Sequence, residues 1–140
     1  MIKKKMLYLI LPIMTLILEI LPYGAVCNFL NPEGEPWRKI YSYFDLLPFG
    51  YANFAPFITA LLTCIIILLL VINLFVNKER LILTVRNILI ITSLISLCPL
   101  IFGISYFSIV GGLITLTLIA NVLLIHFTYK KVSWVWLWKR

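Results

Sequence analysis

Long apolar runs dominate this chain, and short polar or turn-forming stretches separate them. The runs cover residues 6–24, 56–76, 81–102 and 106–127. Each approaches the roughly 20 residues that an α-helix needs to cross the hydrocarbon core of a bilayer. The pattern therefore predicts an all-α integral membrane protein, a bundle of four transmembrane helices that forms a single domain over residues 1–140.

The first run allows a second interpretation. Its basic start and short apolar core are also typical of a secretory signal peptide. Glu19 interrupts that core, however, and the sequence GAVC at 24–27 is a poor cleavage site. We therefore expect an uncleaved helix, bent at Pro12, which removes one backbone donor.

Composition indicates that lipid is the main solvent of the chain. The sequence is 63% hydrophobic and 12% charged, whereas soluble domains are about half apolar and a quarter charged. The net charge of +7 could indicate nucleic-acid binding, but the basic residues flank the apolar runs, as they do in membrane proteins. We therefore expect the lipid bilayer as a partner and no nucleic acid.

The basic residues also predict an orientation. With a cytoplasmic N-terminus, only Arg38 and Lys39 lie outside. All other basic residues lie inside: Lys3, Lys4, Lys5, Lys78, Arg80, Arg86, Lys130, Lys131, Lys139 and Arg140. This asymmetry predicts two cytoplasmic termini, and the composition with its short loops favours a bacterial inner membrane. Tryptophans and lysines in the tail, residues 129–140, are typical of an interfacial anchor; a site for a soluble partner is the alternative.

Residues 22–56 form the only long segment outside the apolar runs, and we expect them to be extracytoplasmic. Turn-forming residues gather at 31–36 and predict an exposed, hairpin-like tip. Apolar side chains recur at helical spacing over residues 37–47, which predicts a short amphipathic helix. The candidates for binding a partner or ligand are Trp37, Arg38, Tyr41, Phe44, Asp45, Phe49 and Tyr51.

Two interpretations of the aromatic residues in this segment stay open. They could form a belt at the membrane–water interface, with the short helix lying on the lipid headgroups. They could also form a recognition surface, because aromatic residues together with Pro and Gly build rigid binding sites.

Glu19 is the one acidic residue inside an apolar run. An acid in a membrane span is expensive and is by default a functional candidate. Glu19 lies near the extracytoplasmic end, so pairing with Arg38, Lys39 or a tyrosine of residues 22–56 is the first expectation. A role in proton or cation coupling and a simple interfacial position are the alternatives.

Small and polar residues mark the faces through which membrane helices pack. In the first two runs these are Tyr8, Pro12, Thr15, Glu19, Thr59, Thr63, Asn73 and Asn77. In the third and fourth runs we predict packing through Thr92, Ser96, Gly103, Ser108, Gly112 and Thr115. Thr117 and Asn121 form a second polar side of the fourth run. They indicate either a helix packed between two neighbours or a contact between copies in a homo-oligomer.

The sequence offers little for catalysis or metal binding. Its one histidine, His126, has no neighbouring nucleophile or acid. Cys27, Cys64 and Cys98 are not spaced as metal ligands, and free thiols are expected. We therefore expect no catalytic residues, no cofactor and no metal.

The leading hypothesis is a non-enzymatic accessory or assembly subunit that binds a membrane-protein partner or a ligand through residues 22–56. The alternative is a small transporter or channel that uses Glu19 and the polar helix faces.

Overall fold

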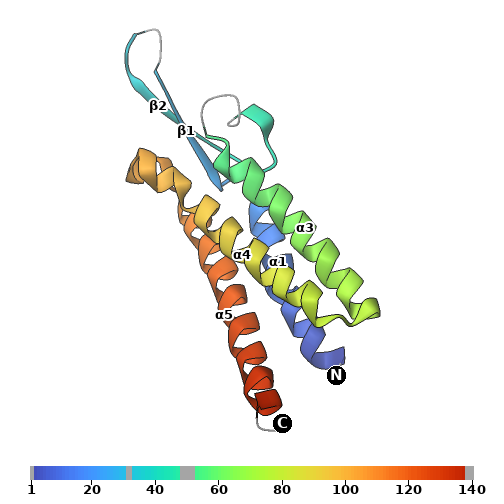
Figure 1. The fold of residues 1–140 in the computed structure, drawn as a ribbon. Coiled ribbons are helices and arrows are strands. Elements are labelled where there is room, and N and C mark those ends of the chain that lie inside the picture. The colour runs from blue at the N-terminus through green and yellow to red at the C-terminus, as the bar shows by residue number, and fades with distance from the viewer. Residues whose placement is uncertain (1, 31–32, 48–52, 138–140) are drawn as a thin grey trace.

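The computed structural model describes residues 2–30, 33–47 and 53–137, with side chains described for 6–30, 33–35, 37–47 and 53–128. Four long helices make up most of it: α1 (Ile2–Ile20), α3 (Ala55–Val76), α4 (Glu79–Ser96) and α5 (Ile109–Leu137). They lie side by side along a common direction (Figure 1), and we call them the helical body. Their number agrees with the four predicted spans.

Each helix of the helical body packs against two others. α1 contacts α3 and α5, and α4 contacts the same two helices. α1 begins and α5 ends at one end, which we call the terminal end (Figure 1). The opposite end, where the two strands project beyond the helices, is the hairpin end.

Three helical segments are long and apolar enough to cross a membrane: Ala55–Val76, Glu79–Phe102 and Ile109–Thr128. The apolar part of α1, Met6–Ile20, is shorter and spans about 22 Å at 1.5 Å per residue. The predicted extension of this first helix to residue 24 is wrong. The helix ends at Ile20, because the next four residues form a bend and a turn that lead into a strand.

The segment after α1 folds into a β-hairpin. β1 (Ala25–Leu30) pairs with β2 (Pro36–Tyr41) in an antiparallel two-stranded sheet. Gly34 adopts a φ of +82° at the exposed tip, a conformation that glycine reaches without steric penalty. The predicted exposed tip at 31–36 is thus confirmed for its described part, 33–35.

The predicted amphipathic helix over residues 37–47 is wrong, because its first half belongs to β2. Apolar residues at helical spacing suggested it, but Trp37, Lys39 and Tyr41 also fit the alternation of a strand. The Lys39 ammonium lies 5.6 Å from the ring centroid of Trp37 and 5.5 Å from that of Tyr41. These contacts, together with pairing to β1, favour the strand.

Two short 3₁₀ helices, η1 (Cys98–Phe102) and η2 (Ile104–Tyr106), join α4 to α5. The third predicted span, 81–102, therefore ends as an α-helix at Ser96. Gly103 lies between η1 and η2 with a φ of +121°. Its predicted role in helix packing is wrong, because it occupies a turn outside both long helices.

α5 continues beyond the predicted end of the fourth span at residue 127 and runs to Leu137. The predicted tail, 129–140, is therefore mostly a continuation of this helix. Its side chains lie outside the described part of the chain.

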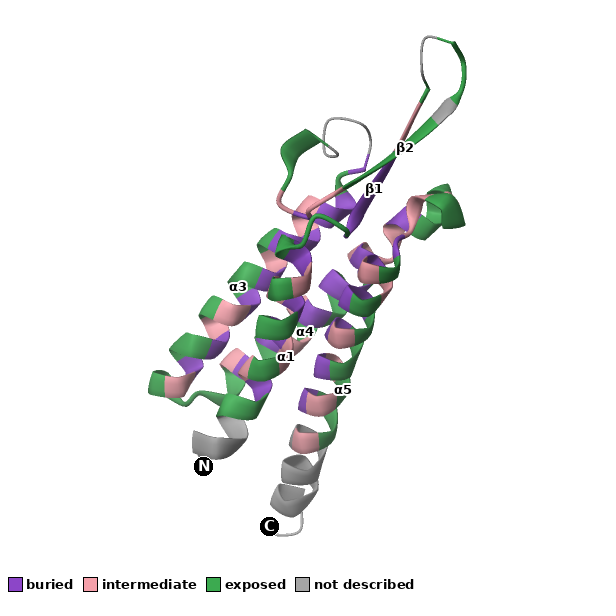
Figure 2. Ribbon diagram, turned by 180° about the vertical axis from the view of Figure 1, so that it is seen from behind, coloured by how far each residue is buried: buried purple, intermediate pink, exposed green. Residues whose placement is uncertain are grey.

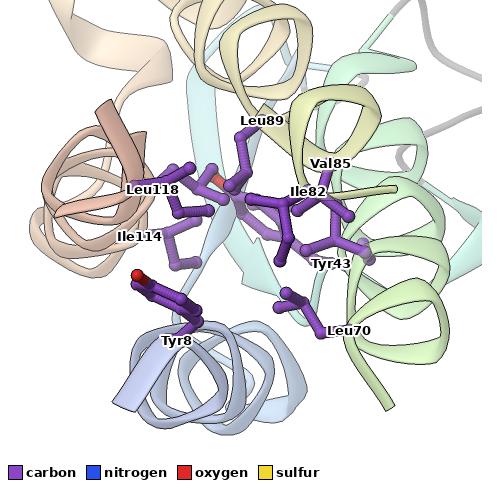
Figure 3. Packing of buried hydrophobic residues seen from close by; sticks show 12 residues of the cluster. Tyr8, Tyr43, Leu70, Ile82, Val85, Leu89, Ile114 and Leu118 are labelled. Atoms are coloured by element: carbon purple, nitrogen blue, oxygen red, sulfur yellow. The ribbon is translucent and has the colours of Figure 1, made fainter. Parts of the chain in front are cut away.

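Buried side chains line the inward faces of all four helices, and exposed ones cover the outward faces (Figure 2). The aliphatic core includes Ile66, Leu70, Ile82, Val85, Leu89, Ile114, Leu118 and Ile125, and several of these converge between the helices (Figure 3). Large apolar residues such as Leu68 and Leu116 are exposed on the outward faces. A surface of this kind is suited to contact with lipid.

Candidate functional site

The hairpin carries exposed apolar side chains. Leu30 is 77% exposed, Trp37 is 51% exposed, and Ile40 is also exposed. The rings of Phe29 and Trp37 meet across the two strands with centroids 6.0 Å apart. Leu30 and Ile40 lie on one face of the two-stranded sheet and Trp37 lies on the other; we call these three residues together the hairpin surface. Exposed apolar residues that gather on a projecting element mark an interaction site.

Two of the predicted binding residues, Arg38 and Asp45, are exposed. The Arg38 guanidinium makes a long contact of 3.5 Å with the backbone oxygen of Phe107. The Asp45 carboxylate accepts a hydrogen bond of 2.8 Å from the backbone N–H of Ser42. Both charged groups therefore help to hold the hairpin end together while they remain open to solvent.

The other predicted binding residues differ in position. Tyr41 and Phe44 are half-buried and pack against the hydrophobic core. Their rings therefore stabilise the fold and expose little surface to a partner. Phe49 and Tyr51 lie outside the described residues.

Below the hairpin the chain folds back onto the end of α1. The backbone N–H of Tyr43 and the hydroxyl of Ser42 both donate to the backbone oxygen of Glu19, each at 3.0 Å. They satisfy a carbonyl group that the end of a helix leaves without a partner. A Cβ on Gly24 would lie 2.7 Å from the ring of Tyr43. We call Glu19, Gly24, Ser42, Tyr43 and Thr63 the junction.

α5 packs against the junction from the side. The hydroxyl of Ser108 donates to the backbone oxygen of Gly24 at 2.6 Å and accepts from the backbone N–H of Gly111 at 2.8 Å. The Tyr43 hydroxyl lies 3.3 Å from where a Cβ on Gly111 would stand. Burial raises the pKa of the Tyr43 phenol, so this group stays neutral at physiological pH.

The carboxyl group of Glu19 is 0% exposed. Its Oε1 lies 2.8 Å from the hydroxyl of Thr63 on α3. Its Oε2 has no hydrogen-bond partner among the described residues. The expected pairing with Arg38 or Lys39 is wrong, because these side chains point to other groups. Of the tyrosines, Tyr43 reaches Glu19 through its backbone N–H.

Four of the predicted packing residues, Thr92, Ser96, Ser108 and Thr115, are buried. The hydroxyls of Ser96 and Thr115 lie 3.0 Å apart and join α4 to α5. Gly112 is half-buried, and a Cβ there would lie 3.4 Å from the ring of Phe107, close to it in the chain. Gly112 thus packs locally, whereas the hydroxyl pair joins two helices.

The second polar side of α5 also faces inward. The hydroxyl of Thr15 on α1 lies 2.8 Å from that of Thr117. Asn121 is 1% exposed, and neither polar atom of its amide has a hydrogen-bond partner among the described residues. These positions are those of a helix packed between two neighbours. They disfavour a homo-oligomer contact through Asn121.

The described residues contain no group of three or more His, Cys, Asp or Glu that could hold a metal ion. The three cysteines are free, and His126 is exposed. The described residues therefore provide two candidate features: the exposed apolar residues of the hairpin and the buried carboxyl group of Glu19.

Sequence reasoning identified Glu19 and placed Thr63 on a packing face, but it did not pair them. The two residues are 44 positions apart, and nothing local links them. The available signal was that each lies on the polar face of its own helix. No feature of the sequence indicated that Gly24 and Tyr43 contribute to the junction.

Three helices that are long and apolar enough to cross a membrane, with exposed apolar faces, indicate a membrane protein. Comparison of the chain with models of protein families, with curated proteins and with solved structures finds no match. The function is therefore argued from the geometry of the site.

Proposed function

We propose that this protein is a non-enzymatic accessory or assembly subunit of a membrane, and that it binds a membrane-protein partner through the hairpin surface. The observation that supports this most directly is the exposure of Leu30, Trp37 and Ile40 on an element that stands clear of the helical body. Tryptophan is among the residues that contribute most to binding energy at protein interfaces.

The stability of the hairpin supports the same proposal. Two strands alone are marginally stable in water. Here the base of β1 is fixed by burial, since Ala25, Val26 and Cys27 are buried, whereas Leu30 at its far end is exposed. The far half of the hairpin would gain from a partner the packing that the described residues do not supply.

We also propose a topology of four membrane-spanning helices with both termini in the cytoplasm, in a bacterial inner membrane. In the described part, Lys78 lies at the terminal end in the turn between α3 and α4, and Arg80 lies in the first turn of α4. An excess of Lys and Arg on one side is the usual mark of the cytoplasmic face. The hairpin is then extracytoplasmic.

A transporter or channel that uses Glu19 remains the alternative. Glu19 is the feature that favours it, as a buried acid within a helix of a membrane protein. On the terminal side of Glu19, however, the facing residues of α3 and α4 include fully buried Ile66, Val85 and Leu89. A path for ions would have to pass these aliphatic side chains, so we rank binding first.

The test is a pull-down from native membranes after gentle detergent extraction. The double variant Leu30→Ala, Trp37→Ala should recover at least about tenfold less partner than wild type, since loss of a central aromatic at an interface costs 2 kcal/mol or more. Tyr41 and Phe44 are left intact because they pack against the core.

The matched control is Phe75→Ala, which removes a side chain that is 84% exposed on α3, away from the hairpin. It should recover as much partner as wild type. A wild-type protein that is recovered alone, or a double variant that keeps the partner, would overturn the proposal. Flux into proteoliposomes that depends on Glu19 would then favour the transporter.

A further inference from the structure

The hydroxyl of Thr63 has two oxygen neighbours and only one proton to give. It lies 2.8 Å from Glu19 Oε1 and 3.0 Å from the backbone oxygen of Thr59. A hydroxyl donates one hydrogen bond, and a backbone carbonyl has no proton to return. An ionised Glu19 makes this hydroxyl share its one proton between two acceptors. A protonated Glu19 lets both contacts be full hydrogen bonds, because Thr63 then donates to Thr59 and accepts from Glu19.

The surroundings of Glu19 favour the same protonation state. No basic side chain among the described residues forms a hydrogen bond with its carboxyl group, and its Oε2 has no partner there. An ionised carboxylate that is buried without a counter-charge costs several kcal/mol. A neutral acid leaves unpaired only a carbonyl oxygen, which costs much less.

We infer that Glu19 is a proton-binding site that fastens the hairpin end to the helical body. Its backbone oxygen accepts from Tyr43 and Ser42, and its carboxyl group lies 2.8 Å from the Thr63 hydroxyl on α3, to which a protonated Glu19 can donate. One residue thus connects the end of α1, the segment after β2, and α3. When Glu19 loses its proton to bulk water, the resulting carboxylate must be hydrated. Water reaches the carboxylate when Ser42 and Tyr43 move away from the end of α1.

The titratable groups close to Glu19 among the described residues are Tyr43 from the segment after β2 and Cys64 from α3. Neither is a cation that would stabilise the carboxylate. The inference rests on the proposed function in one respect. If the hairpin binds a partner, protonation of Glu19 controls how firmly the hairpin is held in its binding position.

The proton itself is tested by infrared spectroscopy of the full-length protein in lipid at neutral pH. Wild type should show the carbonyl band of a protonated carboxyl group, which lies apart from the bands of carboxylates. Glu19→Gln should lose this band. The matched control, Glu79→Gln, removes an exposed carboxyl group and should keep it. Thr63→Val, which removes the acceptor, should shift the band.

The release step is tested by the rate at which a water-soluble maleimide labels buried Cys27, with Cys64 and Cys98 replaced by alanine. In Glu19→Gln the rate should rise with pH only as the thiol ionises, because the amide keeps the hydrogen bond to Thr63. The ratio of the wild-type rate to the Glu19→Gln rate should be close to one in acid and rise above one in alkali.

Each outcome decides one step. A wild-type spectrum without the protonated band would overturn the proton site, and a rate ratio that stays constant with pH would overturn the release. Neither measurement involves a partner. A failed pull-down would therefore leave the proton site standing, and an ionised Glu19 would leave the hairpin surface standing.

Discussion

Single polar side chains inside the helical body are satisfied to very different degrees. The Thr15 hydroxyl bonds to the backbone oxygen of Leu11 and also reaches Thr117 on another helix. Asn121 is fully buried and has no hydrogen-bond partner among the described residues. A buried polar group without a partner lowers stability, and a buried polar group with one raises it modestly.

This contrast predicts opposite effects of one substitution at two asparagines. Asn121→Leu should stabilise the protein by about 1–2 kcal/mol, because leucine is similar in size to asparagine and the change removes a buried amide without a hydrogen-bond partner. Asn53→Leu should destabilise it by about 1–3 kcal/mol, because the Asn53 amide donates to the backbone oxygen of Val26 at 3.1 Å. Thermal unfolding in detergent measures both, and changes of the same sign would contradict the interpretation.

Among the elements, the helices and the exposed tip could be predicted from the sequence, but the strand that follows the tip could not. Runs of apolar residues specify a membrane helix locally. The strand β2 is decided by its pairing with β1, and strand formation depends on such context more than on the spacing of apolar residues. In residues 37–47, some apolar positions fit the helical spacing and some also fit the alternation of a strand. The sequence therefore allowed the helical interpretation, which was wrong.

The register of the hairpin gives a sharp test of this element. Cys27 lies opposite Lys39, and opposite residues of an antiparallel pair point to the same face. With Cys64 and Cys98 replaced by alanine, Lys39→Cys should therefore form an intramolecular disulfide with Cys27. Arg38→Cys should form much less, because its side chain points to the other face.

Burial raises the pKa of the Cys27 thiol, and the thiolate is the reactive form. Formation of this disulfide should therefore be slow at neutral pH and accelerate as the pH rises. Non-reducing gels or mass spectrometry after blocking free thiols would measure it. Equal yields from the two variants would contradict the strand register.

At the scale of the whole molecule, the two ends of the helical body differ in chemistry. The terminal end carries Lys78, in the turn between α3 and α4, and Arg80, in the first turn of α4, whereas the hairpin end carries Glu33 and Glu35 at its tip. The sequence predicted this separation of charge, because alternating spans place alternate loops on the same side. It did not predict the junction, which brings together residues from three separate segments.

The proposed topology follows from this separation of charge. In a cysteine-free background, Glu35→Cys should react with a membrane-impermeant maleimide in intact cells. Asn77→Cys, in the turn at the terminal end, should react only after the cells are made permeable. The reverse pattern would place the hairpin in the cytoplasm and contradict the proposed orientation.

The connection between α4 and α5 has a consequence for biosynthesis. It carries no charged residue, and several of its backbone N–H groups are used in its own tight turns. Moving an ionised side chain through the bilayer centre costs about 2.5–3.5 kcal/mol. In the proposed topology this uncharged connection would therefore cross at little cost, and α4 and α5 could enter lipid as one pair. The hairpin, which carries Glu33, Glu35, Arg38 and Lys39, is then the part whose export demands most of the translocation machinery.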